Sequence, residues 1–512
     1  MRGAGFGPHA NRIHANGGAC FDCRGPLVFD LRPVLFVIGI LLTVLGTAML
    51  IPAMVDLAMG SPDWQIFAAS FAVTIFVGVA LAISARSGAR TLDTRQAFVL
   101  TTFAWVVMAA FGALPMVFSE LDLGYTDAFF EAMSGITTTG STVIIGLDFA
   151  PPGILLWRAL LQWLGGVGII VMALSVLPML RVGGMQLFRM EGSEASEKAL
   201  PRATQIAAAI TLIYLALTIL CTVAYVLVGM TWFEAVAHSM TTIATGGFST
   251  ADQSIGQYQS LGVDVVATIF MILGSLPFLL YLRMVRSLGN PGPLVKDRQV
   301  QWFLAILTLA IATMTLYLLS QHPELSFGDA LQLTTFNVTS VMTGTGYASA
   351  DYGQWGSFAV GALFLLMVVG GCAGSTTCGI KVFRFQVLYA STSALLARLL
   401  HPHGVFTPYY NGKPIPETVS ESVMSFFFLF ALSFCVLALG LAAMGLDFIT
   451  SMSGAATAIA NVGPGLGDEI GPAGTFTNLP DAAKWLMSFG MLLGRLEVFT
   501  VLVLFLPSFW RS

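Results

Sequence analysis

A short glycine-centred loop occurs four times in this 512-residue chain, and the repetition strongly constrains the fold. Each loop follows a short semi-polar segment and lies between long apolar stretches, at intervals of roughly a hundred residues, which indicates an internal repeat. Four copies of helix, re-entrant loop and helix can surround one axis, where backbone carbonyls replace the water around a bare cation. The sequence therefore predicts a cation pore built from one polypeptide. The loops are residues 137–141, 244–247, 344–347 and 461–464, aligned on Gly140, Gly246, Gly346 and Gly463.

The composition is that of an integral membrane protein. Hydrophobic residues make up 56% of the chain, charged residues make up 10%, and the mean hydropathy is +0.82. A soluble globular protein carries about 25% charged residues. Since a hydrocarbon core of roughly 30 Å needs about 20 helical residues, and a span must satisfy its own backbone groups, we expect transmembrane helices. Ten stretches are long enough: residues 34–57, 65–84, 97–119, 154–180, 203–228, 263–282, 302–320, 358–383, 423–444 and 485–506.

Basic residues gather on one predicted side of these helices. They fall in the N-terminal segment and in four loops on its side, one of which holds Lys381 and Arg384. Because cytoplasmic loops are enriched in Lys and Arg, we expect both termini to be cytoplasmic. The opposite loops are acidic, and only Arg158 and Lys484 oppose their charge. An acidic vestibule would concentrate cations, although ordinary topology bias with solvated loops is the alternative explanation.

The predicted fold class is an all-α integral membrane protein, with two leading transmembrane helices and four helix–pore-loop–helix repeats around a pseudo-fourfold pore. The segments before the loops are too short and too polar to cross the membrane. We expect them to be pore helices that point their partly negative C-terminal ends inward. They cover residues 127–136, 232–243, 327–342 and 446–459. The predicted units are a cytoplasmic tail at 1–33, a leading helix pair at 34–95, and pore repeats at 96–202, 203–299, 300–415 and 416–512.

The four loops are the predicted selectivity filter. A filter strand must turn successive carbonyls toward the axis, which forces conformations that glycine adopts without cost. The threonines before the glycines can add hydroxyls or brace the strand. The alternative is that Gly- and Thr-rich turns merely connect helices. The predicted filter residues are Thr138, Thr139, Gly140, Ala244, Thr245, Gly246, Gly344, Thr345, Gly346, Asn461, Val462 and Gly463.

A polar, glycine-rich segment at residues 370–379 interrupts the eighth predicted span. Irregular backbone at membrane depth is tolerated where it is buried in protein or lines a wet cavity. A flexible polar loop just below the filter would act as a gate, and a static helix break is the alternative. The predicted gate residues are Gly371, Gly374, Ser375, Thr376, Thr377, Lys381 and Arg495.

Arg495 lies about midway along the last span. A charge there costs at least about 2.5 kcal/mol, so it should face the bundle interior or water. Facing a cation path, it would form an electrostatic barrier; snorkelling to the cytoplasmic surface is the alternative. Glu497 is two residues on and lies off that helix face. His238, in the second pore helix, is expected to be a packing or mouth residue rather than a ligand.

At this point the motifs resemble a known family over essentially the whole chain from about residue 30. The chain is similar to the TrkH and TrkG potassium-uptake subunits, in the superfamily that also includes KtrB and plant HKT transporters. The extra leading pair of spans resembles TrkH rather than KtrB. The motifs that carry the resemblance are residues 134–140, 162–166, 183–189, 245–249, 371–376 and 461–465.

The resemblance implies a homodimer in the cell inner membrane, each subunit with its own pore. It implies potassium moving inward through the filter, controlled by the intramembrane loop and by an arginine matching Arg495. It also implies a cytosolic ring partner of the TrkA type, whose domains bind nucleotides. This fits the sequence, in which we find no phosphate-cradling glycine-rich motif. Glycine at all four aligned positions favours potassium over sodium. Two positions depart from the family: Gly344 stands where threonine is usual, and Thr377-Cys378 replaces a glycine-richer stretch.

Other functions are less well supported by the sequence. A Na⁺- or H⁺-coupled symporter usually has inverted repeats and intramembrane acids, whereas these repeats share one orientation. An enzyme is not expected, because no Ser/His/Asp set, HExxH motif or paired catalytic carboxylates lie in the spans. Cys20 and Cys23 form a CxxC pair that lacks a second ligand pair at zinc-like spacing. The surroundings of the chain are a lipid bilayer, and no nucleic-acid partner is expected.

Overall fold

The computed structural model describes residues 30–86, 92–175, 203–287 and 289–511. This part of the chain is helical apart from loops and one hairpin, in which β1 (Tyr409–Tyr410) pairs with β2 (Lys413–Pro414). Among the described residues, seven helices are long and apolar enough to span a membrane, or nine if each of two bent helix pairs counts as one span. Cys20, Cys23 and most of the predicted tail and of the basic loop at 181–202 lie outside the described residues.

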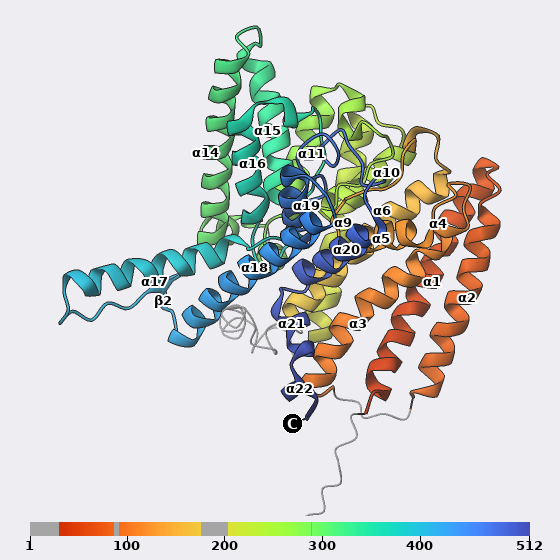
Figure 1. Ribbon diagram of the computed structural model, residues 1–512, viewed down its shortest axis with the longest axis horizontal. Helices are drawn as coiled ribbons and strands as arrows, with labels where there is room; N and C mark the ends of the chain where they lie inside the picture. Colours follow the sequence, from red (N-terminus) through yellow and green to blue (C-terminus); the bar gives the residue numbers. More distant parts are fainter. Residues whose placement is uncertain (1–29, 87–91, 176–202, 288, 512) are drawn as a thin grey trace, which may run out of the picture.

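The leading helices α1 (Arg32–Met59) and α2 (Trp64–Ser84) pack side by side at one edge of the molecule (Figure 1). Their backbones approach closely, since a β-carbon on Gly39 would lie 2.7 Å from the carbonyl oxygen of Gly78. Small residues allow such close helix packing in membranes. The buried Asp56 of α1 accepts a hydrogen bond from the backbone N–H of Gly153 at 2.6 Å. The leading pair is thereby joined to the first pore repeat.

The remaining helices form four successive units of related construction. The first contains α3 (Thr94–Gly112), α4 (Leu114–Val117), α5 (Tyr125–Ile136), η1 (Leu147–Phe149) and α6 (Pro152–Ser175). The second contains α9 (Ala203–Leu227), α10 (Trp232–Ile243), η2 (Ser254–Tyr258), α11 (Leu261–Gly274), α12 (Phe278–Arg286) and α13 (Gly292–Val295). The third contains α14 (Arg298–Gln321), α15 (Phe327–Thr343), η3 (Tyr352–Gln354), α16 (Ser357–Val369) and α17 (Val382–Leu400). The fourth contains α18 (Glu417–Ala443), α19 (Phe448–Ala460), α20 (Asp481–Arg495), α21 (Phe499–Leu502), η4 (Val503–Phe505) and α22 (Pro507–Arg511).

The short helices α5, α10, α15 and α19 coincide with the four segments predicted to be pore helices, and they keep that name below. Three of them begin at a side-chain cap. Thr231, Ser326 and Asp447 accept hydrogen bonds from N–H groups in the first turns of α10, α15 and α19, at 3.3, 3.1 and 2.9 Å. Such caps satisfy N–H groups that have no partner within the helix. The sequence thus fixes where each of these pore helices starts.

Three of the ten predicted spans are broken in the structure, whereas the sequence predicted a break only in the span at 358–383. The span at 263–282 bends by 88° between α11 and α12, where Pro277 lacks an N–H group. The span at 485–506 bends by 110° after Arg495, where Glu497 and Val498 have left-handed backbone. The span at 358–383 ends at Val369, and the chain is irregular until α17 begins. Breaks therefore occur in three repeats, not in the third alone.

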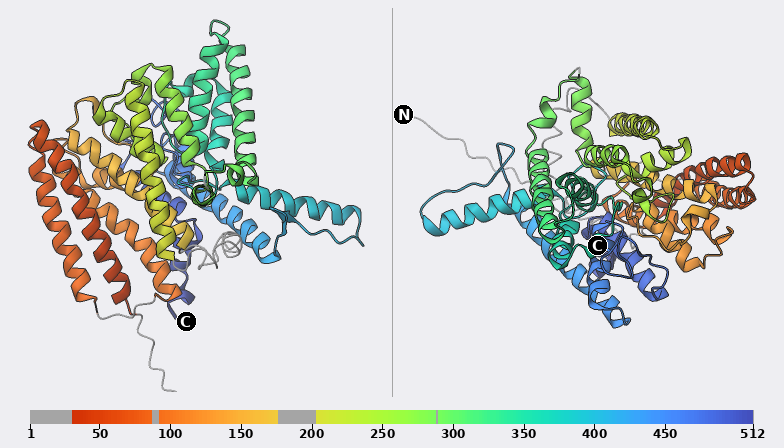
Figure 2. Two further views of the ribbon diagram at one scale, coloured as in Figure 1. Left: turned by 180° about the vertical axis from the view of Figure 1, so that it is seen from behind. Right: turned by 90° about the horizontal axis from the view of Figure 1, so that it is seen from above.

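Helix α17 extends away from the other helices, as Figures 1 and 2 show. Its outer part carries exposed leucines, among them Leu395 and Leu399. The hairpin of β1 and β2 follows it and leads back to α18. The third repeat thus combines a buried, irregular segment with a projecting arm.

Candidate cation pathway

Every pore helix ends in a loop of the same backbone shape. An entry residue with φ between 49° and 69° comes first, a middle residue follows, and a ring glycine with φ between 79° and 113° comes third. Each middle residue donates its N–H to a carbonyl five residues back, at 2.8–3.1 Å. The entry residues are Thr138, Thr245, Gly344 and Asn461; the middle residues are Thr139, Gly246, Thr345 and Val462; the ring residues are Gly140, Gly247, Gly346 and Gly463.

In the second repeat this geometry shifts the predicted register by one residue. Gly247, rather than Gly246, has the left-handed φ of the other ring glycines, and Gly246 takes the middle position. Ala244 lies one residue before the entry position, at the C-terminal end of α10. Two adjacent glycines made both alignments possible, and the backbone dihedral angles and hydrogen bonds distinguish them. Gly344, an apparent departure in sequence, occupies a position where the backbone is left-handed in all four repeats.

The ring glycines close the four loops into a cycle. A β-carbon on any of them would meet the middle carbonyl of the next repeat, so glycine is required for this close approach. The fourth contact returns to the first repeat. The distances from such a β-carbon are 2.2 Å from Gly140 to Gly246 O, 1.8 Å from Gly247 to Thr345 O, 2.1 Å from Gly346 to Val462 O, and 3.0 Å from Gly463 to Thr139 O.

The ring opens onto a cavity of about 300 Å³. Gly140, Gly247 and Gly346 line its floor together with residues of the loops that follow them. Asp252 is also among the lining residues, and one of its carboxylate oxygens accepts hydrogen bonds from Gly146 N and Leu147 N at 3.1 and 3.0 Å. A carboxylate at the mouth of a narrow site raises the local concentration of cations.

Three pore helices hold the chain segment that follows their loop through a side chain nine residues before the ring glycine. Glu131 Oε2 accepts from Val143 N at 2.9 Å, and Asn337 Oδ1 accepts from Ser349 N at 3.1 Å. His238 lies at the matching place and is buried. Its Nε2 lies 3.0 Å from Ser249 Oγ, and its Nδ1 lies 2.9 Å from the carbonyl oxygen of Glu234. Through these partners the His238 side chain links α10 to the segment after the loop, as Glu131 and Asn337 do in their repeats.

Arg158 and Lys484 are buried ion-pair partners rather than solvated loop charges. Arg158 Nε donates to Glu131 Oε1 at 2.8 Å, and another of its nitrogens donates to the carbonyl of Ser249 at 2.8 Å. Arg158 therefore joins the first repeat to the second. Lys484 donates to Asp127 Oδ1 at 2.5 Å, which joins the fourth repeat to the first pore helix. Sequence reasoning assigned these residues to the acidic face and missed the pairs, because the partners come from separate elements.

The irregular segment at 370–381 is buried and hydrogen-bonded to the bend between α11 and α12. The N–H of Cys372 donates to Ser275 O at 3.1 Å, and the carbonyl of Gly374 accepts from Phe278 N at 2.9 Å. Thr376 Oγ1 donates to the carbonyl of Gly274 at 2.9 Å. The second and third repeats thus satisfy each other's backbone polar groups at their helix breaks. Irregular backbone is tolerated at membrane depth when it is buried in protein in this way. Of the predicted gate residues, Gly371, Ser375 and Thr377 lie in the same buried segment.

Arg495 crosses from the last repeat to this segment. Its side chain is 2% exposed, and it donates to the carbonyl of Thr376 at 3.1 Å and to the carbonyl of Gly165 at 3.2 Å. One nitrogen also lies 2.6 Å from Cys378 Sγ. The guanidinium thus connects the fourth, third and first repeats, and it does not snorkel to the surface. Thr376 reaches the filter as well, since its hydroxyl lies 3.1 Å from Thr245 Oγ1.

Lys381 and Arg384 form a buried cluster with Glu497 and are not solvated loop charges. Lys381 donates to Glu497 Oε1 at 3.2 Å, and Arg384 donates to Glu497 Oε2. The Arg384 guanidinium also lies over the ring of Phe426, 3.7 Å from its centroid. Charges are stable in protein interiors when they are paired and hydrogen-bonded. The cluster fastens the end of the irregular segment to the bend after α20.

A multi-pass helical membrane protein in which four re-entrant loops close into a ring is the class that this fold and site define. The TrkH model, described as a cation transport protein, matches residues 63–512. The Trk system potassium uptake protein TrkI of Halomonas elongata is 47% identical over 481 residues, which cover 94% of this chain and 97% of that protein. The protein TrkH of Vibrio parahaemolyticus is 39% identical over 485 residues, covering 94% and 99%.

A solved structure agrees with these sequence relatives. The crystal structure of the potassium transporter TrkH from Vibrio parahaemolyticus matches with a TM-score of 0.88 at 37% identity, and covers 94% of this chain and 100% of that chain. The chain therefore belongs to the TrkH family of cation transport proteins, a transport family and not an enzyme family. The predicted family and the all-α membrane fold class are confirmed.

Proposed function

We propose that this chain takes up potassium ions by a channel-like route along the axis of the four-repeat ring. The observation that carries the proposal is the cycle of left-handed glycines, each against the middle carbonyl of the next repeat. Backbone carbonyls held in this way can replace the hydration shell of a cation. The relatives TrkI and TrkH are potassium uptake proteins, which makes potassium the expected cargo. The entry, middle and ring residues, preceded by Ala244 in the second repeat, are the proposed filter.

The gate in this proposal is the segment at 370–381 together with Arg495. A fixed positive charge below the filter opposes a passing cation, and a low-dielectric surrounding strengthens that repulsion. The hydrogen bonds from Arg495 to Thr376 and Gly165 support a closed arrangement, because the segment cannot move without breaking them. Lys381 anchors the far end of the segment through Glu497. Opening would then be a rearrangement of the segment rather than of the filter.

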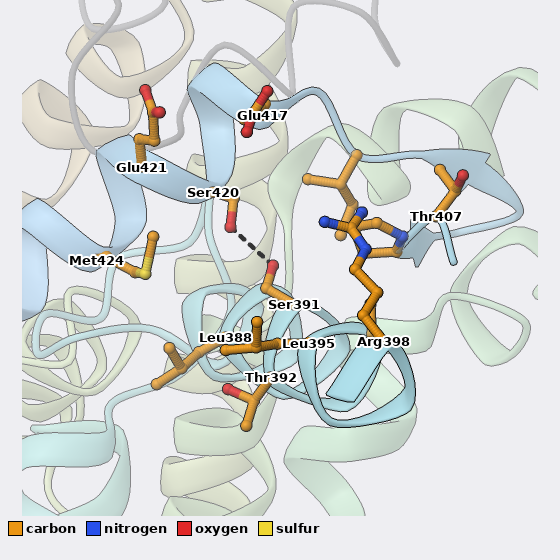
Figure 3. A pocket seen from close by; sticks show the side chains of 13 residues that line it. Leu388, Ser391, Thr392, Leu395, Arg398, Thr407, Glu417, Ser420, Glu421 and Met424 are labelled. Carbon is orange, nitrogen blue, oxygen red and sulfur yellow. Dashed lines mark hydrogen bonds between the residues drawn. The ribbon is translucent and has the colours of Figure 1, made fainter. Parts of the chain in front are cut away.

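The proposal includes the cell inner membrane, with both termini in the cytoplasm, and two kinds of partner. These are a second copy of the chain, in a homodimer, and a cytosolic TrkA-like ring that supplies nucleotide control. Helix α17 projects from the other helices and exposes leucines, and this supports the proposal that lipid or another subunit covers it. A cavity of about 480 Å³ lies between α17 and α18, beside the hydrogen bond of 2.8 Å between Ser420 and Ser391 (Figure 3).

The alternative is a symporter that couples the cation to Na⁺ or H⁺ and selects less strongly for potassium. A proton carrier needs a carboxylate that can lose its charge partner. Glu131 and Glu497 are both buried, and both are held by basic side chains. This pairing argues against Glu131 and Glu497 as proton carriers.

The test is ion flux into proteoliposomes, with potassium and sodium compared for the wild type and Arg495→Ala. We expect selective potassium flux that persists without a sodium or proton gradient and rises in the variant. The same flux is measured in vesicles that also contain the cytosolic ring partner. Flux that appears only with the partner identifies a closed pore, and no flux in either case identifies an inactive protein. Flux that stops when the sodium or proton gradient is removed would establish the symport alternative. An absence of potassium flux even with the partner would contradict the proposal.

A further inference from the structure

The filter loop of the second repeat is held by a side chain from the first. Gln162, fully buried on α6, donates from Nε2 to the carbonyl of Gly246 at 2.6 Å. Its Oε1 accepts from the N–H of Phe248 at 3.1 Å. The amide therefore bonds the chain on both sides of the ring residue Gly247. Because one bond needs a donor and the other an acceptor, the orientation of the amide is fixed.

The same amide explains why glycine stands at the middle position of the second repeat. Gly246 is not among the residues with left-handed φ, so its backbone does not demand glycine. A β-carbon there would lie 2.4 Å from Cδ of Gln162, closer than β-carbons approach other atoms. The matching residues Thr139, Thr345 and Val462 all carry side chains. In the second repeat, the amide of Gln162 fills the place that a middle side chain takes elsewhere.

This arrangement breaks the fourfold likeness of the repeats. Three helix glycines pack under a carbonyl at the C-terminal end of a pore helix: Gly165 under Ile136, Gly274 under Ile243, and Gly494 under Ile459. The residue three positions before each of them is Gln162, Met271 and Met491. A methionine has no N–H to donate and only a weak acceptor. Among these three positions, Gln162 alone can clasp a filter loop from both sides.

We propose that Gln162 is a positioning residue that sets ion selectivity, by holding Gly246 and Gly247 at the width that suits potassium. The inference rests on the proposed function of the ring as the filter. The carbonyl oxygen of Thr345 occupies the space where a β-carbon of Gly247 would lie. A shift of the second loop therefore changes its contact with the third repeat. A ring that can widen or narrow on one side discriminates less well between cations of different radius.

The test is a size-compensation experiment on the full-length protein in proteoliposomes. Gln162→Ala removes the clasp and leaves space, whereas Gly246→Thr adds the side chain found at Thr139 and Thr345. We expect each single variant to lower the potassium-to-sodium flux ratio by about fivefold to tenfold, the scale of one or two lost hydrogen bonds. The double variant should recover much of the ratio, because the threonine occupies the vacated space. Met271→Ala, at the matching place on α11, is the control and should leave the ratio unchanged.

Two outcomes would overturn the inference. One is a wild-type flux ratio in Gln162→Ala, and the other is a folded double variant whose flux ratio is no better than that of its worse parent.

If Gln162→Ala does not fold, Gln162→Glu provides the test. The ionised carboxylate keeps an acceptor for Phe248 N but repels the carbonyl of Gly246, and burial favours the neutral form, so selectivity should be low at alkaline pH and recover as the pH falls and the carboxyl group donates. A purely structural role predicts no such pH profile. A wild type without potassium selectivity would contradict the proposed function instead.

Discussion

The side-chain amide of Asn461 donates a hydrogen bond of 2.8 Å to Thr139 Oγ1, which joins the last filter loop to the first. The same nitrogen donates to the carbonyl of Met491 at 3.0 Å. Asn461 also has a left-handed backbone, with φ of 53°. Asparagine tolerates this conformation better than other non-glycine residues. Asn461 thus tolerates the left-handed backbone at this position and also makes the contact that closes the cycle.

Two substitutions at this position should separate these contributions. Asn461→Gly keeps the backbone free but removes the hydrogen bonds, whereas Asn461→Ala removes both advantages. We expect Asn461→Ala to be less stable than Asn461→Gly by about 1 kcal/mol, the cost of a left-handed alanine. Both should lose potassium selectivity. Thermal unfolding in detergent and flux ratios in vesicles measure the two effects, and an alanine variant more stable than the glycine variant would contradict this assignment.

Glu497 compensates two buried cations, so its neutralisation should destabilise the protein strongly. Removal of one partner from a buried ion pair costs roughly 3–5 kcal/mol, because the other charge remains buried and unpaired. We expect Glu497→Gln to lower the melting temperature markedly and to release the segment at 370–381. Lys381→Met in the Glu497→Gln background should restore part of the stability. Equal melting temperatures for wild type and Glu497→Gln would show that the cluster contributes little.

Gly344 should accept asparagine with little loss. Its φ of 69° is left-handed, as at Asn461, and a β-carbon there would lie 3.3 Å from the carbonyl of Asn461, which is tight but adjustable. We expect Gly344→Asn to fold and keep potassium selectivity, with a stability loss of about 1 kcal/mol, and Gly344→Val to lose more, since β-branched residues avoid this region. Gly247→Ala is the contrasting variant and should abolish selective flux. Loss of flux in Gly344→Asn would show that this glycine has a further role.

Asp56 should contribute to the docking of the leading helix pair. Its carboxylate accepts from Gly153 N at the start of α6, as an N-cap would, but from another helix. We expect Asp56→Ala to lower stability by about 1–2 kcal/mol, the usual cost of a lost cap. Flux through the ring should persist, because the filter contacts do not involve α1. Limited proteolysis of the loop between α2 and α3 reports the loosened pair, and an unchanged cleavage rate would argue against this role.

The pore helices were predictable from sequence because their signals are local. A polar cap, about three turns of mixed residues and a glycine-rich end place α10 at the predicted residues 232–243. The apolar spans were predictable in position for the same reason. The bends after Gly274 and Arg495 were not predicted, although Pro277 lies at the first and the charged Glu497 at the second, because each stretch as a whole stays long and apolar enough to be one span. The potassium filter, the gate and the partners stay predictions.

The contacts between repeats were harder to predict. The pairs Arg158–Glu131 and Lys381–Glu497 join residues from elements whose proximity depends on the assembled bundle. Gln162 stood within a motif that carried the family resemblance, but its role became visible only beside Gly246. In each case the residue types were conspicuous in an apolar chain, and the partner was undetermined. A buried charge in sequence predicts that a partner exists without saying which residue it is.

The contact between Gly463 and the carbonyl of Thr139 also bears on how such a protein is made. A ribosome delivers the repeats in order, and domains tend to fold as they emerge. Until the fourth loop arrives, the first three leave a slot that is open along one side. More than three hundred residues separate Thr139 from Gly463 in the sequence. Contacts between residues so far apart in sequence are among the slowest to form in folding. On the pathway proposed above, an unfinished chain therefore has no enclosed passage for an ion.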